Sequence, residues 1–259
     1  MTVEADKILE IACLASIVIL QNGGETYRAE EIALRICESG GYAASEVMAL
    51  PTGVFITLID NGKPVGTIVK RTTKRGINLS KLDRANYISR AFESREYTED
   101  EAINELSLLD KSDFKHKNRI LSAVIGAMAA VFFTLLYGGN FFDCMIGLLC
   151  GFIVQIISSS FRRTNIYHFA MSFIGGIVIS LIAVCAVTVF KTGSIDAIII
   201  GGIIPLLPGL AMVNAIRDTM MGDLVSGVAR LGEVLLIAAS IACGVGIVFY
   251  IYIALGGVV

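Results

Sequence analysis

Long, continuously apolar runs fill the second half of the sequence and restrict its fold more than any other feature. Five such runs lie at about residues 120–137, 141–161, 166–190, 194–216 and 233–255. A helix needs ~20 mostly apolar residues to cross a bilayer, at a rise of ~1.5 Å per residue. The runs do not alternate between apolar and polar residues, which argues against a membrane β-barrel. The sequence therefore predicts an α-helical integral membrane protein with five transmembrane helices.

Charged residues divide the chain into two parts. The first 119 residues hold 34 of the 44 Asp, Glu, Lys and Arg residues, and the remaining 140 residues hold ten. Net charge is near zero in both parts, which disfavours a nucleic-acid partner. We therefore expect a soluble domain at residues 1–118, followed by a transmembrane domain at residues 119–259.

The soluble part reads as a small α+β domain of order ααββαα. Helices are expected at about residues 5–20, 26–38, 80–92 and 98–109, the third capped near Ser80 and the last opened by a capping box at Thr98 and Glu101. Residues 54–59 and 65–69 are rich in β-branched side chains. Asn61 and Gly62 between them favour a type I′ turn and predict a hairpin.

Neither the N-terminus nor the cysteines indicate processing or a metal site. The N-terminus is acidic, and the apolar stretch at residues 11–20 suits a buried helix better than a signal sequence or a membrane span. The six cysteines lack a CxxC spacing and lie on apolar stretches, so we interpret them as reduced packing residues. We expect no metal and no cofactor.

The fourth apolar run contains two prolines near its centre. Pro205 and Pro208 cannot donate backbone hydrogen bonds, so the carbonyls of Gly201 and Ile204 lose their helical partners. Broken helices at mid-membrane often form substrate sites in secondary transporters. The alternative is an ordinary proline kink in a packed bundle.

A broken span would offer opposite poles to a small charged metabolite. The helix starting at Pro208 would present a positive N-terminus to a carboxylate, while the freed carbonyls could accept from an ammonium group. The hypothesis assigns substrate binding to the break and to a polar stripe on the second span, comprising Gly201, Ile204, Pro205, Pro208, Gly209, Asn214, Gln155, Ser158 and Ser159. The stripe could instead serve interhelical hydrogen bonding.

Ionisable residues beside the last two spans are candidates for coupling or gating, because charges near a membrane core usually face partners or cavities. They are Arg217, Asp218, Asp223, Arg230 and Glu233. Arg230 and Glu233 are three residues apart on one helix face and could simply pair with each other.

Basic residues at the span ends predict orientation. Those on one side are Lys111, Lys115, Lys117, Arg119, Arg162, Arg163, Arg217 and Arg230, whereas only Lys191 falls on the other. The rule therefore predicts a cytoplasmic N-terminal domain and an external C-terminus. His116 is expected to be solvated, and Asp143 and Asp196 near the outer ends are expected to be wet.

Residues 24–28 (GETYR) place a glycine ahead of charged and hydroxyl groups at the start of a helix. Free backbone N–H groups there could hold an anion. Glu25 would compete for the same donors, and the alternative is a helix cap with a surface turn. The sequence has no GxxxxGK[ST] motif for a nucleotide-driven pump.

Three segments in this order, residues 24–30 (GETYRAE), 75–82 (RGINLSKL) and 205–209 (PLLPG), resemble the threonine/serine exporter family. The resemblance is closest to the YjjP-like subunit of its split, two-protein form. It implies a bacterial plasma (inner) membrane location and export of threonine and serine or of succinate. It also implies a smaller YjjB-like membrane subunit as partner, with the possibility of homo-oligomers.

Three function classes remain open from sequence. The first is a subunit of a secondary exporter driven by an ion gradient or by the substrate gradient. The second is a membrane-embedded enzyme, which is disfavoured because HExxH, GxSxG and paired acids within the spans are lacking. The third is a regulatory or assembly subunit whose partner carries the transport path. The residues do not identify the substrate or the coupling ion.

Overall fold

The computed structural model describes residues 3–72, 76–112, 119–161 and 168–257. Its contacts separate the chain into two compact units, one of Met1–Asp113 with Gly209–Leu231 and the other of Phe114–Pro208 with Gly232–Val259. The expected domain boundary at residue 118, and the basic residues Lys115, Lys117, Arg162 and Arg163 together with His116, lie outside the described residues.

The first unit contains an antiparallel sheet of order β1-β2-β3, formed by Glu46–Leu50, Gly53–Asp60 and Lys63–Arg71. The expected hairpin is confirmed, since Asp60 pairs with Lys63 across a turn in which both central residues have positive φ. Asn61 has φ 48° and Gly62 has φ 74°, the backbone that a type I′ turn requires.

Strand β1 corrects the expected order to ααβββαα. It pairs with β2 along its full length, from Glu46 opposite Thr57 to Leu50 opposite Gly53. Only Ala49 in this strand is buried. An edge strand with one small buried residue lacks the alternation of apolar and polar residues that marks a strand in sequence, because its pairing comes from the backbone.

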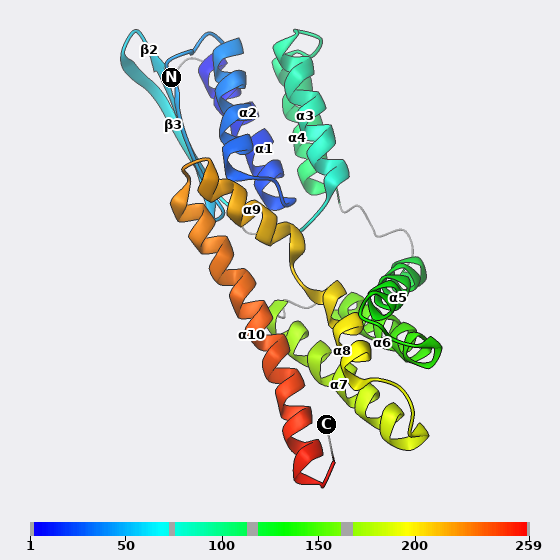
Figure 1. The fold of residues 1–259 in the computed structure, drawn as a ribbon. Helices are drawn as coiled ribbons and strands as arrows, with labels where there is room; N and C mark the ends of the chain where they lie inside the picture. Colours follow the sequence, from blue (N-terminus) through cyan, green and yellow to red (C-terminus); the bar gives the residue numbers. More distant parts are fainter. Residues whose placement is uncertain (1–2, 73–75, 113–118, 162–167, 258–259) are drawn as a thin grey trace. The chain divides into compact units, whose positions relative to one another are not determined.

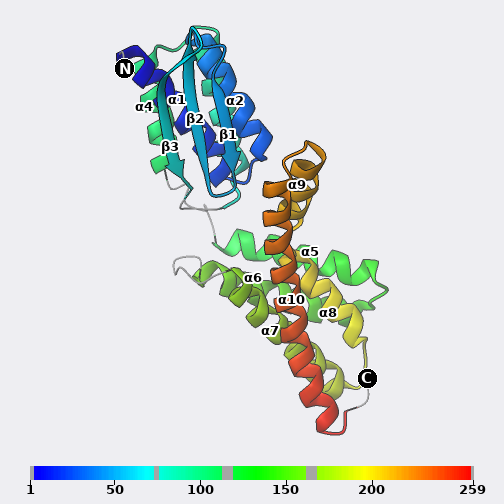
Figure 2. The same cartoon turned by 90° about the vertical axis from the view of Figure 1, so that its left-hand side faces the viewer.

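Four helices complete this fold in two layers on the sheet. Helices α1 (Val3–Gln21) and α2 (Thr26–Ser39) contact the strands, and α3 (Leu79–Glu93) and α4 (Glu99–Lys111) pack against α1 from the other side (Figure 1, Figure 2). Because α1 lies between the sheet and the outer helices, its surface is covered on opposite sides, and every residue from Ile11 to Leu20 is buried. This position explains the apolar stretch at residues 11–20.

The helix caps follow the expectations with one correction. Helix α4 opens with the capping box, in which Thr98 and Glu101 each accept from the other's backbone N–H. Helix α3 is capped by Asn78, whose side chain accepts from Lys81 N at 3.1 Å, and not near Ser80. Either side chain can cap a helix, and the extended backbone at Asn78 decides the position.

The second unit contains the apolar helices α5 (Arg119–Leu136), α6 (Phe141–Phe161), α7 (His168–Phe190) and α8 (Ile195–Ile203), and the 3₁₀ turn η1 (Ile204–Leu206). Helix α9 (Gly209–Met220) belongs to the first unit, whereas α10 (Leu224–Ala254) runs through residues of both. Among the described residues, three segments are long and apolar enough to cross a membrane: Phe141–Ser158, Phe169–Phe190 and Leu224–Ala254.

A fourth span results if Ile195–Leu206 and Gly209–Met220 count as one interrupted crossing. The first apolar run forms a shorter helix over Ile120–Leu136. The protein is therefore mostly helical with three to four candidate spans, and the fifth span stays a prediction.

Glycines allow close helix packing inside the second unit. A Cβ at Gly151 would lie 2.9 Å from the carbonyl oxygen of Gly126 on α5, so the absent side chain lets α5 and α6 approach closely. Asp143, expected to be wet, is only 1% exposed. It accepts from Asn140 N and Ser194 N, both at 2.9 Å, and thereby satisfies backbone donors at two helix starts.

Candidate functional site

Polar and charged side chains gather inside the first unit, where the N-terminus of α2 meets α9 and the first turns of α10. We call this group the latch cluster. Its members are Gly23, Gly24, Glu25, Thr26, Arg28, Glu30, Asn214, Arg217, Asp218, Asp223, Ser226 and Arg230. It brings together four of the five predicted coupling residues, together with Asn214 from the predicted substrate group.

A buried ion pair lies at its centre. Asp218 is fully buried, and its Oδ2 lies 3.0 Å from Nε of Arg230, whose side chain is 12% exposed. The Nε–H does not point at that oxygen, so the contact is an ion pair without an aligned hydrogen bond. Arg230 also donates to the carbonyl of Gly24 at 2.9 Å.

Asp218 also satisfies the start of helix α2. The backbone N–H of Thr26, at the first helical position, donates to Oδ1 of Asp218 at 3.2 Å. The helix N-terminus therefore holds a carboxylate, as the anion interpretation of residues 24–28 expected, but that carboxylate belongs to the chain itself. Glu25 is 6% exposed, so the turn is not a surface turn.

Two further contacts tie α9 to the same turn. Arg217 donates to Oε1 of Glu25, and Arg28 lies 3.6 Å from the other oxygen of that carboxylate. The side-chain amide of Asn214 donates to the carbonyl of Gly23 at 2.8 Å. The contacts of Arg217 and Asn214 join residues more than 190 positions apart and position one face of α9 against the start of α2.

Glu30 adds a further carboxylate to the latch cluster. Glu30, half-buried and one turn along α2, accepts from Ala49 N at 2.8 Å. Burial raises the pKa of the Glu30 carboxyl above its ordinary value; the hydrogen bond from Ala49 lowers the pKa, and the negative charges of Asp223 and Asp218 raise it.

Several buried polar atoms of the described residues in this cluster have no hydrogen-bond partner. They are Thr26 Oγ1, Asp218 Oδ2, Asp223 Oδ2, Ser226 Oγ and Arg230 Nε. Buried polar groups are normally paired, so such a concentration at one place calls for a physical explanation. Within the described residues, no group of three or more His, Cys, Asp or Glu side chains is arranged to hold a metal ion.

The first two of the three sequence segments singled out above lie side by side. The backbone N–H of Gly76 donates to Gln21 O at 2.8 Å, and that of Asn78 donates to Asn22 O at 3.0 Å. A Cβ at Gly24 would lie 3.1 Å from the Leu82 side chain. The described part of residues 75–82 therefore supports the turn that opens α2.

The predicted break in the fourth run is present, but its carbonyl groups are partly satisfied. Helix α8 gives way to the turn η1 and to an extended Leu207, whose N–H donates to the carbonyl of Ile204 at 3.1 Å. A Cβ at Gly201 would lie 2.7 Å from Thr134 N and 2.9 Å from Ala130 O of α5. Gly201 thus serves helix packing, whereas a Cβ at Gly209 would meet none of the described atoms within 4 Å.

The predicted polar stripe on α6 is only partly described. Gln155 is half-buried. A Cβ built at Gly126 on α5 would lie 3.4 Å from the Gln155 side chain, so Gln155 packs on α5. Ser158 is half-buried, and Ser159 is not among the residues whose side chains the structure describes. The substrate role of these residues, of Pro205 and of Pro208 stays a prediction, as does the coupling role of Glu233.

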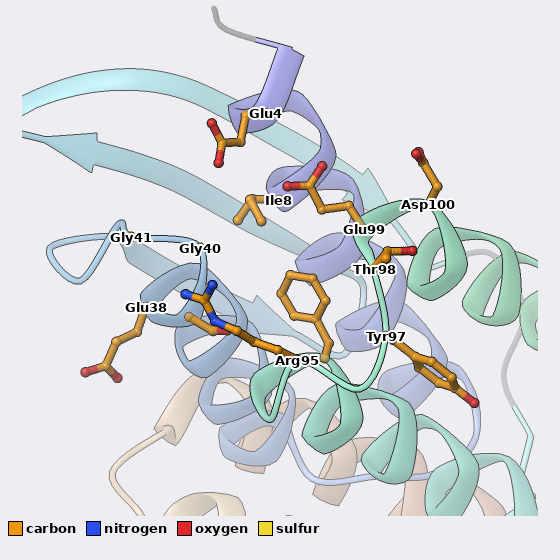
Figure 3. A pocket seen from close by; sticks show the side chains of 12 residues that line it. Glu4, Ile8, Glu38, Gly40, Gly41, Arg95, Tyr97, Thr98, Glu99 and Asp100 are labelled. Atoms are coloured by element: carbon orange, nitrogen blue, oxygen red, sulfur yellow. The ribbon is translucent and has the colours of Figure 1, made fainter.

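A separate hollow of about 670 Å³ lies at another end of the first unit, between the first turns of α1, the end of α2 and the α3–α4 turn (Figure 3). Its carboxylates are Glu4, Glu38, Glu99 and Asp100, and Arg95 extends across it (Figure 3). Lys7 forms an ion pair with Asp100, with 2.8 Å between Nζ of Lys7 and Oδ1 of Asp100. An anionic ligand would be repelled here, so the hollow does not suit a carboxylate substrate.

The sequence pointed to the α9 and α10 side of the latch cluster and to residues 24–28 as a possible anion site, but it did not indicate Glu30. The available signal was the spacing of Asn214 and Asp218, four residues apart on one face of a mostly apolar helix. A polar face of that kind needs a partner. Its partner could not be inferred, because it lies near the other end of the chain.

A family model described as a putative threonine/serine exporter matches residues 10–252. A probable threonine/serine exporter of Mycobacterium tuberculosis is 23% identical over 240 residues, which cover 92% of this chain and 45% of that protein. A probable succinate transporter subunit YjjP of Klebsiella aerogenes is 21% identical over 257 residues, covering 93% and 95% respectively. The chain thus spans less than half the length of the mycobacterial relative. No solved structure matches it.

Proposed function

Because the chain belongs to the threonine/serine exporter family, we propose that it is a subunit of a secondary transporter that moves small polar metabolites out of the cell. The family match over residues 10–252 is the observation that carries this proposal. The candidate spans supply the membrane-crossing segments that such a role requires. Transport, and not catalysis, is the activity proposed.

The proposed substrates are threonine- or serine-type amino acids, or dicarboxylates of the succinate type. One relative is named for the first group and the other for the second. All of these compounds carry a carboxylate. The proposal keeps the break after α8 as the substrate site, supported by the extended backbone at Leu207.

A second membrane protein is proposed as partner. The Klebsiella relative is named a subunit, and this chain matches 95% of its length. The mycobacterial relative is more than twice as long as the part that matches. A smaller YjjB-like subunit supplying further spans would account for both observations. We place the complex in the bacterial plasma membrane, with the N-terminal domain in the cytoplasm.

Efflux from loaded cells tests the proposal. Cells lacking this gene are loaded with a panel of amino acids and dicarboxylates, and the loss of each compound is compared with and without the chain and its partner. We expect faster efflux of threonine, serine or succinate, and slower efflux when Pro205 and Pro208 are both replaced by alanine. Pro64→Ala in strand β3 is the matched control. Equal efflux of every compound with and without the chain would refute the proposal.

The latch cluster favours a second candidate, a gating subunit whose partner carries the path. One ion pair joins Arg217 of α9 to Glu25 at the start of α2, and another joins Arg230 of α10 to Asp218 of α9. Such contacts could hold these helices in one arrangement, as a gating role requires. Reconstitution separates the two roles. Flux through vesicles that contain only this chain favours the transport role. The gating role is favoured if flux requires the partner and does not change when Pro205 and Pro208 are replaced by alanine.

A further inference from the structure

One face of the three-stranded sheet carries an exposed apolar row. The buried residues of the strands point toward α1 and α2, and Figure 2 looks onto the opposite face. On that face Met48 is paired with Phe55, and Phe55 with Val69, so the three residues form one row across the strands. They are 53%, 43% and 62% exposed. A sheet face that meets water is usually polar, so this row is unusual for a surface without a partner.

The charges on this face are arranged diagonally. We call it the open face; its nine residues are the apolar row Met48, Phe55 and Val69, the flanking row Leu50, Gly53 and Arg71, and the flanking row Glu46, Thr57 and Thr67. Phe55 is at its centre. Glu46 and Arg71, its two charged residues, lie at diagonally opposite corners and are both exposed. The open face is therefore neutral overall, with its two charges well separated.

These two charges cannot pair within one chain. Glu46 is opposite Thr57 and Arg71 is opposite Gly53, which puts them four residues apart along β2 and on the two outer strands. At ~3.4 Å per residue and ~4.8 Å between strands, that separation is roughly 17 Å. Neither residue forms an ion pair with another described residue. Each charge is therefore available to a partner.

We propose that the open face is the contact surface for a second copy of this chain, packed face to face about a two-fold axis that runs through Phe55. The axis follows the diagonal from Leu50 to Thr67. Arg71 of each copy then lies over Glu46 of the other, and Phe55 meets Phe55 of the second copy. A two-fold contact must be self-complementary, and the diagonal charges of the open face satisfy that requirement.

The side chains beside the axis fit the same arrangement. Met48 of one copy lies over Gly53 of the other, where no side chain obstructs it, and Val69 lies over Thr57. The strands of the two copies cross steeply, as in the orthogonal class of sheet packing. A membrane surface fits less well, because the open face has no net charge to attract anionic lipids. The open face thus gives the predicted homo-oligomer a specific surface.

The size of the open face limits the strength of the contact. Three strands and five residue positions span ~14 Å by ~17 Å, or ~240 Å² of flat area. Stable interfaces bury ~800 Å² per partner. The contact is therefore weak in dilute solution, and we expect it to form where a membrane holds both copies at high local concentration. A test needs the membrane-embedded chain.

Disulfide cross-linking of the full chain in its membrane tests the contact. Cys185 and Cys243, the exposed cysteines among the described residues, are first replaced by serine. Phe55→Cys places a thiol on the axis, so oxidation should join two copies into a covalent dimer. Thr67→Cys is a second reporter on the axis that leaves Phe55 intact. Leu108→Cys, exposed on α4, is the collision control and should stay mostly monomeric.

Charge exchange in the Thr67→Cys reporter tests the orientation. Glu46→Arg should slow cross-linking about fivefold, because two exposed ion pairs are lost at once, and Arg71→Glu should do the same. The double variant Glu46→Arg, Arg71→Glu restores both pairs between the copies and should recover the rate of the reporter alone. Glu31→Arg on α2, which changes an exposed carboxylate outside the open face, is the control and should leave the rate unchanged.

Thermal unfolding of each variant shows that it folds. Cross-linking of both axis reporters at the rate of Leu108→Cys would overturn the proposal, and so would a double variant as slow as the single ones. The contact is independent of the transport role, so these measurements need no substrate and hold whether or not efflux is observed.

Discussion

At the residue scale, the protein depends on a few charged side chains that are buried and paired. Asp218 is the clearest case, because it is fully buried and is held by Thr26 N and by Arg230. Exposed ion pairs contribute little by comparison, since water screens them. The pair of Arg84 and Glu105 is of that exposed kind, with side chains 44% and 37% accessible.

Asp218→Asn is expected to destabilise the first unit strongly, because Arg230 keeps its charge and loses its partner. Removing one member of a buried ion pair typically costs about 3–5 kcal/mol. Urea unfolding of the full chain in mild detergent, followed by far-UV circular dichroism, measures the loss. Glu105→Gln is the control and should cost at most about 1 kcal/mol. The prediction is wrong if both substitutions cost the same, and an Asp218→Asn, Arg230→Met double mutant should recover part of the loss.

At the element scale, glycine positions decide which helices can approach each other. Gly201 on α8 faces the backbone of α5, and Gly202 faces the side chain of Ile179 on α7. Two adjacent glycines thus let one short helix pack against two neighbours. Gly201 was predicted to take part in substrate binding, and the packing gives it a structural role.

Gly201→Ala should disrupt the contact between α5 and α8, because its Cβ would lie 2.7 Å from Thr134 N and backbone atoms cannot rotate away. We expect a lower Tm and a smaller monodisperse fraction in size-exclusion chromatography of the purified protein. Gly209→Ala adds the same methyl group where no atom of the described residues lies within 4 Å, and should behave like the wild type in both measurements. Similar behaviour of the two variants would show that α8 and α5 are not packed this closely.

At the scale of the whole molecule, the compact units do not follow the order of the chain. Residues 209–231 belong with the N-terminal α+β fold, although the chain passes through four apolar helices before reaching them. The start of α2 is therefore completed by residues more than 190 positions later. A fragment that ends at residue 112 lacks every α9 and α10 partner of Glu25 and Thr26.

Hydrogen–deuterium exchange should reveal that loss. Compared with the full chain, a fragment of residues 1–112 should exchange faster at amides 24–30, because Thr26 N loses Asp218 and the first turn of α2 frays. Amides of α4, whose capping box is local, should exchange at the same rate in both and serve as the internal control. Unchanged exchange at amides 24–30 would mean that α9 does not stabilise this turn.

The sequence by itself determined the features whose causes are local. The Asn61-Gly62 hairpin, the capping box at Thr98 and Glu101, and the long apolar helices follow from backbone preference and from hydrophobic length, which a short segment carries in full. Tertiary structure alone decided that β1 pairs with β2, that Asp143 is buried, and that Asp218 caps the helix opened by Thr26. A buried charge or an edge strand is stabilised by a partner far away in the chain, and no pattern within a segment records which partner that will be.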